Sequence, residues 1–239
     1  MIPQIIHYCW FGRSEMPSLA QKCMASWREY MPTWEYKRWD EDSFDVNSVP
    51  YTKEAYKAKK YAFVSDYVRL WALYNEGGLY LDVDFEVFKP FDDLMDKDAF
   101  AGFEGSKHSP VMMGVMASHP SGIWVKEMLD AYQNRHFILD DGSFDMRTNV
   151  QYINAIMREQ GFVQNGEEQD YKDLHIFPVE YFCPRQTTGE YLYTENTYCD
   201  HLGLGSWEGG NDGWKVRLGQ LLGQKNMTKL IKLKRKLLG

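Results

Sequence analysis

The amino-acid sequence predicts an α/β fold built around a mainly parallel sheet. Short apolar runs bounded by turn residues alternate along the chain with longer stretches whose apolar residues recur at helical spacing. This strand-helix-strand alternation is typical of a parallel sheet covered by helices. The chain has 239 residues, which suits one sizeable domain with its own core. No internal repeat or low-complexity linker interrupts the alternation, so we expect a single domain.

Turn residues delimit the predicted elements. The Phe11-Gly12 pair follows the first apolar run, Pro17 precedes the first helical stretch, and the Gly77-Gly78 pair provides a left-handed helix end. In chain order we predict a strand at 5–10, a helix at 18–30, a strand at 34–39, a long helix at 54–75, strands at 79–83, 100–103 and 111–117, helices at 121–132 and 150–160, and a strand at 176–181.

The charge of the chain is unevenly distributed. Its formal net charge is −7, which argues against a nucleic-acid partner, because phosphate backbones are bound by surplus Lys and Arg. Residues 225–239 contain six of the 27 basic residues and no acid, so the preceding chain holds 21 basic and 34 acidic residues, a net charge of −13. If this acidic part binds an anionic nucleotide, we expect it to need a cation.

Cysteine spacing and hydropathy indicate the cellular compartment of the protein. The four cysteines lie far apart and show no Cys-x-x-Cys spacing, so we expect reduced thiols rather than a zinc site or a disulfide framework. The N-terminus lacks a basic leader, and no apolar run reaches transmembrane length. The sequence therefore predicts a cytosolic protein.

Two carboxylates, Asp82 and Asp84, stand at the end of the apolar run 79–83. In an open α/β sheet, the carboxyl end of a strand faces the ligand site. Hard oxygen ligands suit Mg²⁺ or Mn²⁺ and leave coordination positions for diphosphate oxygens. An isolated Asp-x-Asp is also common in ordinary turns, so its surroundings decide its meaning.

Asp66 and Arg69 lie three residues apart on the preceding predicted helix, and therefore on one helical face. They could form a surface ion pair worth a few tenths of a kcal/mol. Alternatively, the carboxylate could bind sugar hydroxyls while the guanidinium fork binds sugar or phosphate. The two residues alone leave both interpretations open.

Three blocks of sequence occur in a recognisable order. They are Ile2 to Gly12, then Ala62 to Leu70 followed by Tyr74 to Asp84, and finally Thr194 to Tyr198 with the segment that ends at Gly205-Ser206-Trp207. Together they resemble glycosyltransferase family 32, the DXD-containing sugar transferases, which include bacterial capsular polysaccharide transferases and Golgi mannosyltransferases, with large glucosylating toxins as distant relatives. The resemblance implies a GT-A fold, a nucleotide-binding α/β sandwich, over residues 1–224, which leaves 225–239 as a basic tail.

The same resemblance implies a role for individual residues. Leu202 departs from the bacterial pattern, because a second histidine is usual at that position. By resemblance, Trp10 lies beside the nucleotide base, Asp66 and Arg69 hold the donor sugar, Tyr80 lines the same site, Asp82 and Asp84 flank the cation with Asp84 as the direct ligand, His201 completes the metal or diphosphate shell, and Ser206 and Trp207 belong to the loop that closes over the donor.

The resemblance implies the retaining transfer of a hexose from a nucleotide-sugar donor to an oligosaccharide or lipid-linked glycan, in the synthesis of a bacterial capsular or surface polysaccharide. A UDP-sugar is favoured and a GDP-sugar is possible, with Mn²⁺ or Mg²⁺ as cofactor. No dedicated nucleophile is recognisable, which favours front-face attack over a covalent intermediate. A phosphatase is disfavoured, because Phe85-Glu86 follow the Asp-x-Asp where small or hydroxyl residues are expected. A non-catalytic sugar-nucleotide or glycan-binding protein is the remaining alternative.

The basic tail suggests a membrane contact. Leu230, Leu233 and Leu237 recur at helical spacing, and basic residues occupy much of the remaining surface of such a helix. The segment could lie on an anionic membrane beside a lipid-linked acceptor, or pack its leucines on the body of the protein. The first interpretation predicts a peripheral location on the inner face of the cell membrane.

Overall fold

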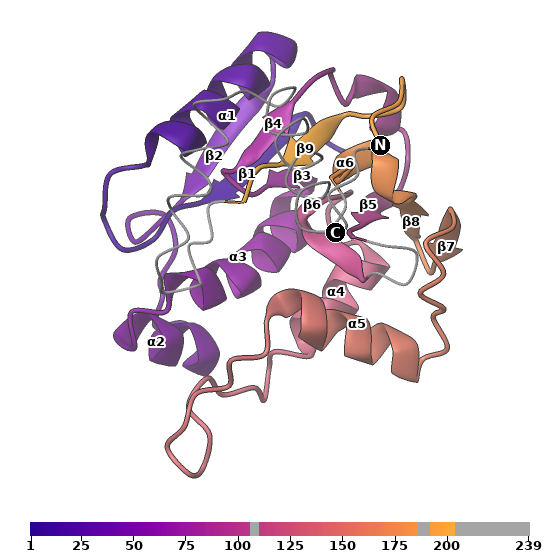
Figure 1. Cartoon of the computed structure of the whole chain (residues 1–239). Helices are drawn as coiled ribbons and strands as arrows, with labels where there is room; N and C mark the ends of the chain where they lie inside the picture. The colour runs from indigo at the N-terminus through magenta and orange to yellow at the C-terminus, as the bar shows by residue number, and fades with distance from the viewer. Residues whose placement is uncertain (106–109, 186–191, 204–239) are drawn as a thin grey trace, which may run out of the picture.

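The computed structural model describes residues 1–105, 110–185 and 192–203 and shows a central seven-stranded sheet (Figure 1). Five strands, β2, β1, β3, β5 and β8, run in one direction, while β6 and β7 run the opposite way. The predicted α/β fold with a mainly parallel sheet is therefore confirmed. Across the sheet, the strands are β2 (Glu35–Trp39), β1 (Ile5–Cys9), β3 (Gly78–Leu81), β6 (Val111–Ser118), β5 (Ala99–Phe103), β8 (Leu174–Phe177) and β7 (Gln169–Tyr171).

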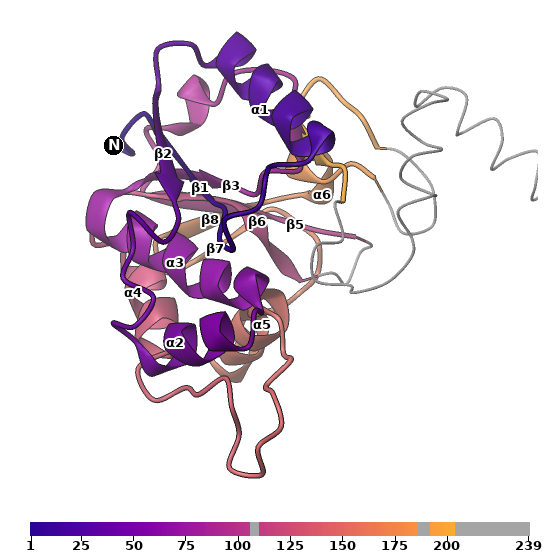
Figure 2. The ribbon, with the colours of Figure 1, turned by 90° about the vertical axis from the view of Figure 1, so that its left-hand side faces the viewer.

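Helices cover both faces of this sheet. Figure 2 shows α1 (Ser18–Tyr30) on one side, and α2 (Pro50–Lys57), α3 (Tyr61–Glu76), α4 (Ile123–Asp130) and α5 (Asn149–Glu159) on the other. The side of α1 also holds the short elements η1 (Asp92–Leu94) and α6 (Val179–Phe182), and a two-stranded sheet of β4 (Phe85–Val87) and β9 (Cys199–His201). The protein thus has three layers.

Strand alternation divides the apolar residues into two cores. Along β3, Leu79 and Leu81 pack into the core under α1, whereas Tyr80 points into the core under α3. Likewise, β1 sends Ile6 and Tyr8 to the α1 side and Cys9 to the α3 side. Burial of both faces explains why the sheet strands read as continuous apolar runs rather than as alternating patterns.

The single long helix predicted at 54–75 is wrong in one respect, because the structure has two helices there. The break falls between α2 and α3, where Lys59 adopts a left-handed φ of 58° and the Lys60 N–H donates to the Ala55 carbonyl at 2.9 Å. Such a left-handed residue ends a helix by satisfying its last carbonyls. The reversal lets α2 pack against α3, a tertiary contact that helical periodicity cannot reveal.

Two other elements differ from the prediction. The strand expected at 176–181 ends at Phe177, and α6 begins directly after Pro178, which lacks the N–H that a continuing strand would need. The strand expected at 79–83 ends at Leu81, where the chain turns towards β4. The three-residue strands β4, β7 and β9 were not predicted, since such short segments carry little periodicity. Among the described residues, no helix combines the length and apolar composition needed to span a membrane.

The junction between α3 and β3 depends on glycine. Gly77 ends the helix with a φ of 68°, and Gly78 starts the strand with a φ of 104°. A Cβ on Gly78 would lie 2.7 Å from the Ile5 carbonyl oxygen, because β1 and β3 run side by side there. This junction places α3 directly before the strand that ends in the Asp-x-Asp motif.

We expect Gly78→Ala to lower the free energy of unfolding by about 3 kcal/mol, since strain at positive φ adds to a steric clash. Gly161→Ala is the matched control, because Gly161 has a φ of 89° but no atom near its missing Cβ. The control should lose only about 1–2 kcal/mol. Urea denaturation of the two variants measures both losses. Equal losses would contradict the proposed clash with β1.

Candidate active site

Arg69 lies at the centre of a buried polar cluster. Its Nη1 donates to the Met113 carbonyl at 2.7 Å and pairs with Asp82 Oδ2 at 3.3 Å, while Nη2 pairs with Asp66 Oδ1 at 3.1 Å. The guanidinium also lies over the Tyr80 ring, 4.7 Å from its centroid. The side chain is only 8% exposed, so the surface ion pair considered from sequence is excluded. Arg69 instead joins a helix carboxylate to the strand-end carboxylate.

Asp66 is held from a second direction by Asn149, the first residue of α5. The Asn149 N–H donates to Asp66 Oδ2 at 3.1 Å, and the Asn149 amide donates to the Asp66 carbonyl at 3.0 Å. A capping box between Thr148 and Gln151 sets the start of this helix. Asn149 was not among the predicted site residues, because only the tertiary fold brings α5 to α3.

Asp82 and Asp84 occupy the turn that joins β3 to β4. Asp82 continues the face of Tyr80, two residues earlier, so it meets Arg69 on the α3 side of the sheet. The Tyr80 hydroxyl donates to Asp82 Oδ1 at 2.8 Å. A Cβ on Gly114 of β6 would lie 2.9 Å from Asp82 Oδ2, so glycine leaves the space that the carboxylate occupies. The chain then bends, and Asp84 turns away towards β9.

Asp84 meets His201 through the pairing of β4 with β9. Phe85 is the register partner of His201, and their rings stack 4.7 Å apart at 8°. His201 Nε2 lies 3.1 Å from Asp84 Oδ2. Burial alone would lower the pKa of His201, but the charge and hydrogen bond of Asp84 outweigh it and raise that pKa to about 9. At neutral pH the pair is therefore an imidazolium and a carboxylate.

The predicted metal ligands are only partly brought together. Among the residues that the structure describes, no group of three or more His, Cys, Asp or Glu side chains is arranged to hold a metal ion. The 3.1 Å between Asp84 and His201 is, however, close to the spacing of about 3 Å between adjacent ligands of an octahedral ion. The carboxylate of Asp84 also suits Mn²⁺ or Mg²⁺, whereas imidazole is more typical of softer metals. Both Asp82 oxygens accept hydrogen bonds from other residues, so its place in the set of Asp84, Asp82 and His201 stays a prediction.

The remaining predicted residues fall in two groups. Tyr80 is fully buried, and the Arg69 guanidinium lies over its ring. Tyr80 therefore supports Arg69 from below and does not line the surface of the site. Trp10 directly follows β1 and is partly exposed, and its indole N–H donates to the Ser14 carbonyl at 2.7 Å. Ser206 and Trp207 lie outside the described residues, as does the tail 225–239. The roles of Trp10, Ser206 and Trp207 stay predictions.

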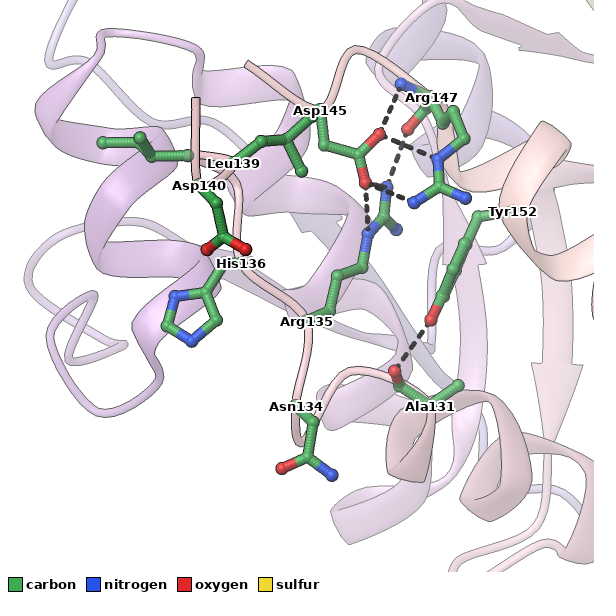
Figure 3. Close-up of a pocket in the computed structure, with 10 residues that line it drawn as sticks. Ala131, Asn134, Arg135, His136, Leu139, Asp140, Asp145, Arg147 and Tyr152 are labelled. Atoms are coloured by element: carbon green, nitrogen blue, oxygen red, sulfur yellow. Dashed lines mark hydrogen bonds and ion pairs between the residues drawn. The ribbon is translucent and has the colours of Figure 1, made fainter. Parts of the chain in front are cut away.

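A cavity of about 370 Å³ lies beside the segment that leads into α5 (Figure 3). It is lined by residues between Ala131 and Tyr152 and contains none of the predicted site residues. At its wall Arg135 and Asp145, each 4% exposed, form an ion pair, and Arg147 also binds Asp145 at 2.8 Å. This network holds the residues just before Asn149, so the wall of the cavity helps to position the start of α5.

Comparison with known proteins agrees with the resemblance. Residues 17–101 match the family described as "Glycosyltransferase sugar-binding region containing DXD motif". This segment contains Asp66, Arg69, Asp82 and Asp84. The resemblance to the DXD-containing glycosyltransferases is thereby confirmed.

Two fungal proteins are similar over part of the chain. "Glucan organizing enzyme 1" of Cryptococcus neoformans var. grubii serotype A is 29% identical over 133 residues, which cover 51% of this chain and 36% of that protein. "Inositol phosphoceramide mannosyltransferase 3" of Schizosaccharomyces pombe is 30% identical over 142 residues, which cover 57% of this chain and 40% of that protein. The match therefore spans well under half the length of either relative.

Solved structures share the fold. A glycosyltransferase involved in glycosylation of the major capsid of PBCV-1 aligns with a TM-score of 0.53 and 13% identity, covering 92% of this chain and 100% of that one. The PaToxG glycosyltransferase aligns with a TM-score of 0.52 and 16% identity, covering 67% and 70% respectively. The expected GT-A fold is confirmed.

The environment of Asp66 predicts a pH-dependent stability. Burial raises the pKa of this carboxyl from 3.8 to about 6, although Arg69 opposes the shift. Between these two values the native state holds a proton that the unfolded chain has released, so the free energy of unfolding falls as pH rises. We expect Asp66→Asn to remove this fall, which amounts to roughly 2 kcal/mol between pH 4.5 and 7.

Chemical denaturation across that pH range measures the effect in the parent and the variant. Asp96→Asn serves as the control, because Asp96 is an exposed carboxylate remote from the cluster in sequence. The control should keep the pH dependence of the parent. If Asp66→Asn keeps it as well, the pKa of Asp66 is not raised in the native state.

Proposed function

Because the chain carries the DXD-containing sugar-binding region of glycosyltransferases, we propose that it transfers a hexose from a nucleotide-sugar donor to a glycan acceptor. The observation that carries this proposal is the buried Arg69 bridge between Asp66 and Asp82, with Asp84 of the same turn paired to His201 of β9. The bridge uses buried polar interactions to hold two carboxylates beside each other. That cost is expected at a ligand site rather than in an ordinary core.

The two bridged carboxylates are suited to the donor sugar. The side chains of Asp66 and Asp82 are 12% and 32% exposed, so each can still accept a hydrogen bond from a hydroxyl group. Arg69 already donates to protein acceptors from Nε, Nη1 and Nη2, which suggests that it mainly positions the carboxylates. We therefore assign sugar binding to Asp66 and Asp82, and orientation of both to Arg69.

Asp84 and His201 would hold the divalent cation, with Asp82 close by. When bound, Mn²⁺ or Mg²⁺ neutralises the charge that develops on the departing nucleotide diphosphate. Imidazole binds metals in its neutral form, so metal binding at this pair would release the proton of His201. The acidic cluster would otherwise repel the diphosphate, which supports the expected metal dependence.

The hydrogen bonds and ion pairs of Asp66 and Asp82 bear on the stereochemical course of the transfer. Asp66 is tied to Arg69 and Asn149, and Asp82 to Arg69 and Tyr80, so neither is an unencumbered nucleophile. This supports retention by front-face attack, in which the leaving phosphate takes the proton of the acceptor hydroxyl. One relative is named as a mannosyltransferase, so GDP-mannose belongs beside UDP-hexoses among the donors to test. A lipid-linked bacterial surface polysaccharide remains the acceptor class that the family resemblance suggests.

The test is a panel of UDP- and GDP-hexoses with Mn²⁺, read by thermal shift and by donor hydrolysis. We expect one donor to raise the melting temperature, because it binds only the folded state, and to be hydrolysed slowly until a chelator is added. Asp84→Asn should lower that hydrolysis about 100-fold or more, because an anionic ligand for the cation is lost.

Glu86→Gln is the matched control, since Glu86 lies two residues further on but pairs with Lys22 at 2.8 Å. This control should keep the parental rate. A donor that binds without any turnover would instead support the non-catalytic alternative. Hydrolysis by Asp84→Asn within a factor of a few of the parent would remove Asp84 from the metal site.

We also propose that residues 225–239 bring the enzyme to an anionic membrane. Each Lys or Arg close to an anionic leaflet contributes about 1 kcal/mol, and the segment has six without an acid. The full chain should co-sediment with phosphatidylglycerol vesicles at low salt, and a full-length variant with these six residues changed to Gln should not. Equal sedimentation of both, or binding unaffected by salt, would favour the alternative in which the leucines pack on the body.

A further inference from the structure

A fourth carboxylate reaches the active-site edge of the sheet, from a strand that carries none of the motif residues. Glu104 is the first residue after β5. Both β3 and β5 are antiparallel to β6, so they run in the same direction and end at the same edge. The Glu104 N–H donates to the Pro110 carbonyl at 3.0 Å, which ties the residue to the start of β6.

Strand alternation indicates the side on which the Glu104 side chain lies. Phe103 packs into the core under α3, whereas a Cβ on Gly102 would lie 2.6 Å from the Phe182 ring of α6. Glu104 therefore faces the layer of α6 and β9, the layer that holds His201. Burial raises the pKa of the Glu104 carboxyl group, the charge of His201 opposes this shift and that of Asp82 adds to it, which agrees with the placement from strand geometry.

Among the residues that the structure describes, Glu104 differs from the other acids of the site, because its side chain has no partner there. Asp66 and Asp82 are bound to Arg69, and Asp84 is bound to His201. Within the described ranges, the partly buried Glu104 carboxylate makes no hydrogen bond or ion pair. A carboxylate removed from water without such a partner is costly, and a hydroxyl-rich ligand would offset that cost.

We propose that Glu104 is an acceptor-binding residue, whose carboxylate accepts a hydrogen bond from a hydroxyl group of the acceptor sugar. This inference rests on the proposed glycosyltransferase function. The donor-side acids come from α3 and β3, while Glu104 comes from the other side of β6. In front-face transfer the acceptor must lie on the side of the leaving phosphate, beside the Asp84–His201 pair, and Glu104 ends its strand at the same sheet edge and faces the layer that holds His201.

The experiment compares water with a sugar as the acceptor of the same donor. Glu104→Gln and Glu104→Ala are assayed for hydrolysis of the donor found above, and for transfer to methyl glycosides of glucose, galactose and mannose. We expect donor hydrolysis and its donor KM to stay within about threefold of the parent. The ratio of transfer to hydrolysis should fall at least about tenfold, through a higher KM for the glycoside.

Glu29→Gln, which changes an exposed carboxylate on α1, is the matched control and should keep the parental ratio. A parental ratio in both Glu104 variants would overturn the proposal, as would a donor KM that rises as much as the glycoside KM. A parent whose donor hydrolysis is neither inhibited nor diverted by any glycoside would overturn it too. A parent that hydrolyses no donor would instead refute the proposed function itself, and the two failures are therefore distinguishable.

Discussion

The rest of the site depends on the ion pairs and the hydrogen bond of the buried Arg69 guanidinium. A cation removed from water is tolerated only when its donors are satisfied and its charge is balanced. Asp66, Asp82 and the Met113 carbonyl meet both conditions, and they come from α3, the β3–β4 turn and β6. The same contacts that make the burial acceptable also set the positions of two carboxylates, so the stability of the fold and the geometry of the site are linked.

The second half of the motif belongs to the other layer. Asp82 remains on the α3 side with Tyr80, but the turn after it carries Asp84 across to β9. There, the stacking of His201 on Phe85 orients the imidazole towards Asp84. One short turn thus sends its two acidic residues to opposite layers, which separates the carboxylate bound to Arg69 from the carboxylate paired with His201.

Charge explains why such a site needs several partners. Asp66, Asp82, Asp84 and Glu104 lie near one sheet edge, in a chain whose net charge is already negative. Arg69 balances the first two and the imidazolium of His201 the third. Glu104, which has no such partner within the described part of the chain, leaves one acid of this edge without a balancing group.

Local sequence was enough to determine the α/β class and most element positions, because periodicity and turn residues act within a few residues. The site roles of Asp66, Arg69, Asp82 and Asp84 were predicted from the family resemblance, because their spacing alone left an ordinary ion pair and an ordinary turn open. The contacts of Asn149 and the position of Glu104 could not be predicted, because α5 and β5, which place them, lie outside the motif and meet it only in the folded protein. The division of the helix at 54–75 was missed for a related reason, since only the packing of α2 on α3 favours the left-handed turn at Lys59. The sequence alone thus determined which groups could do the chemistry, and only the tertiary structure decided which of them meet, because burial and charge balance are properties of the packed layers.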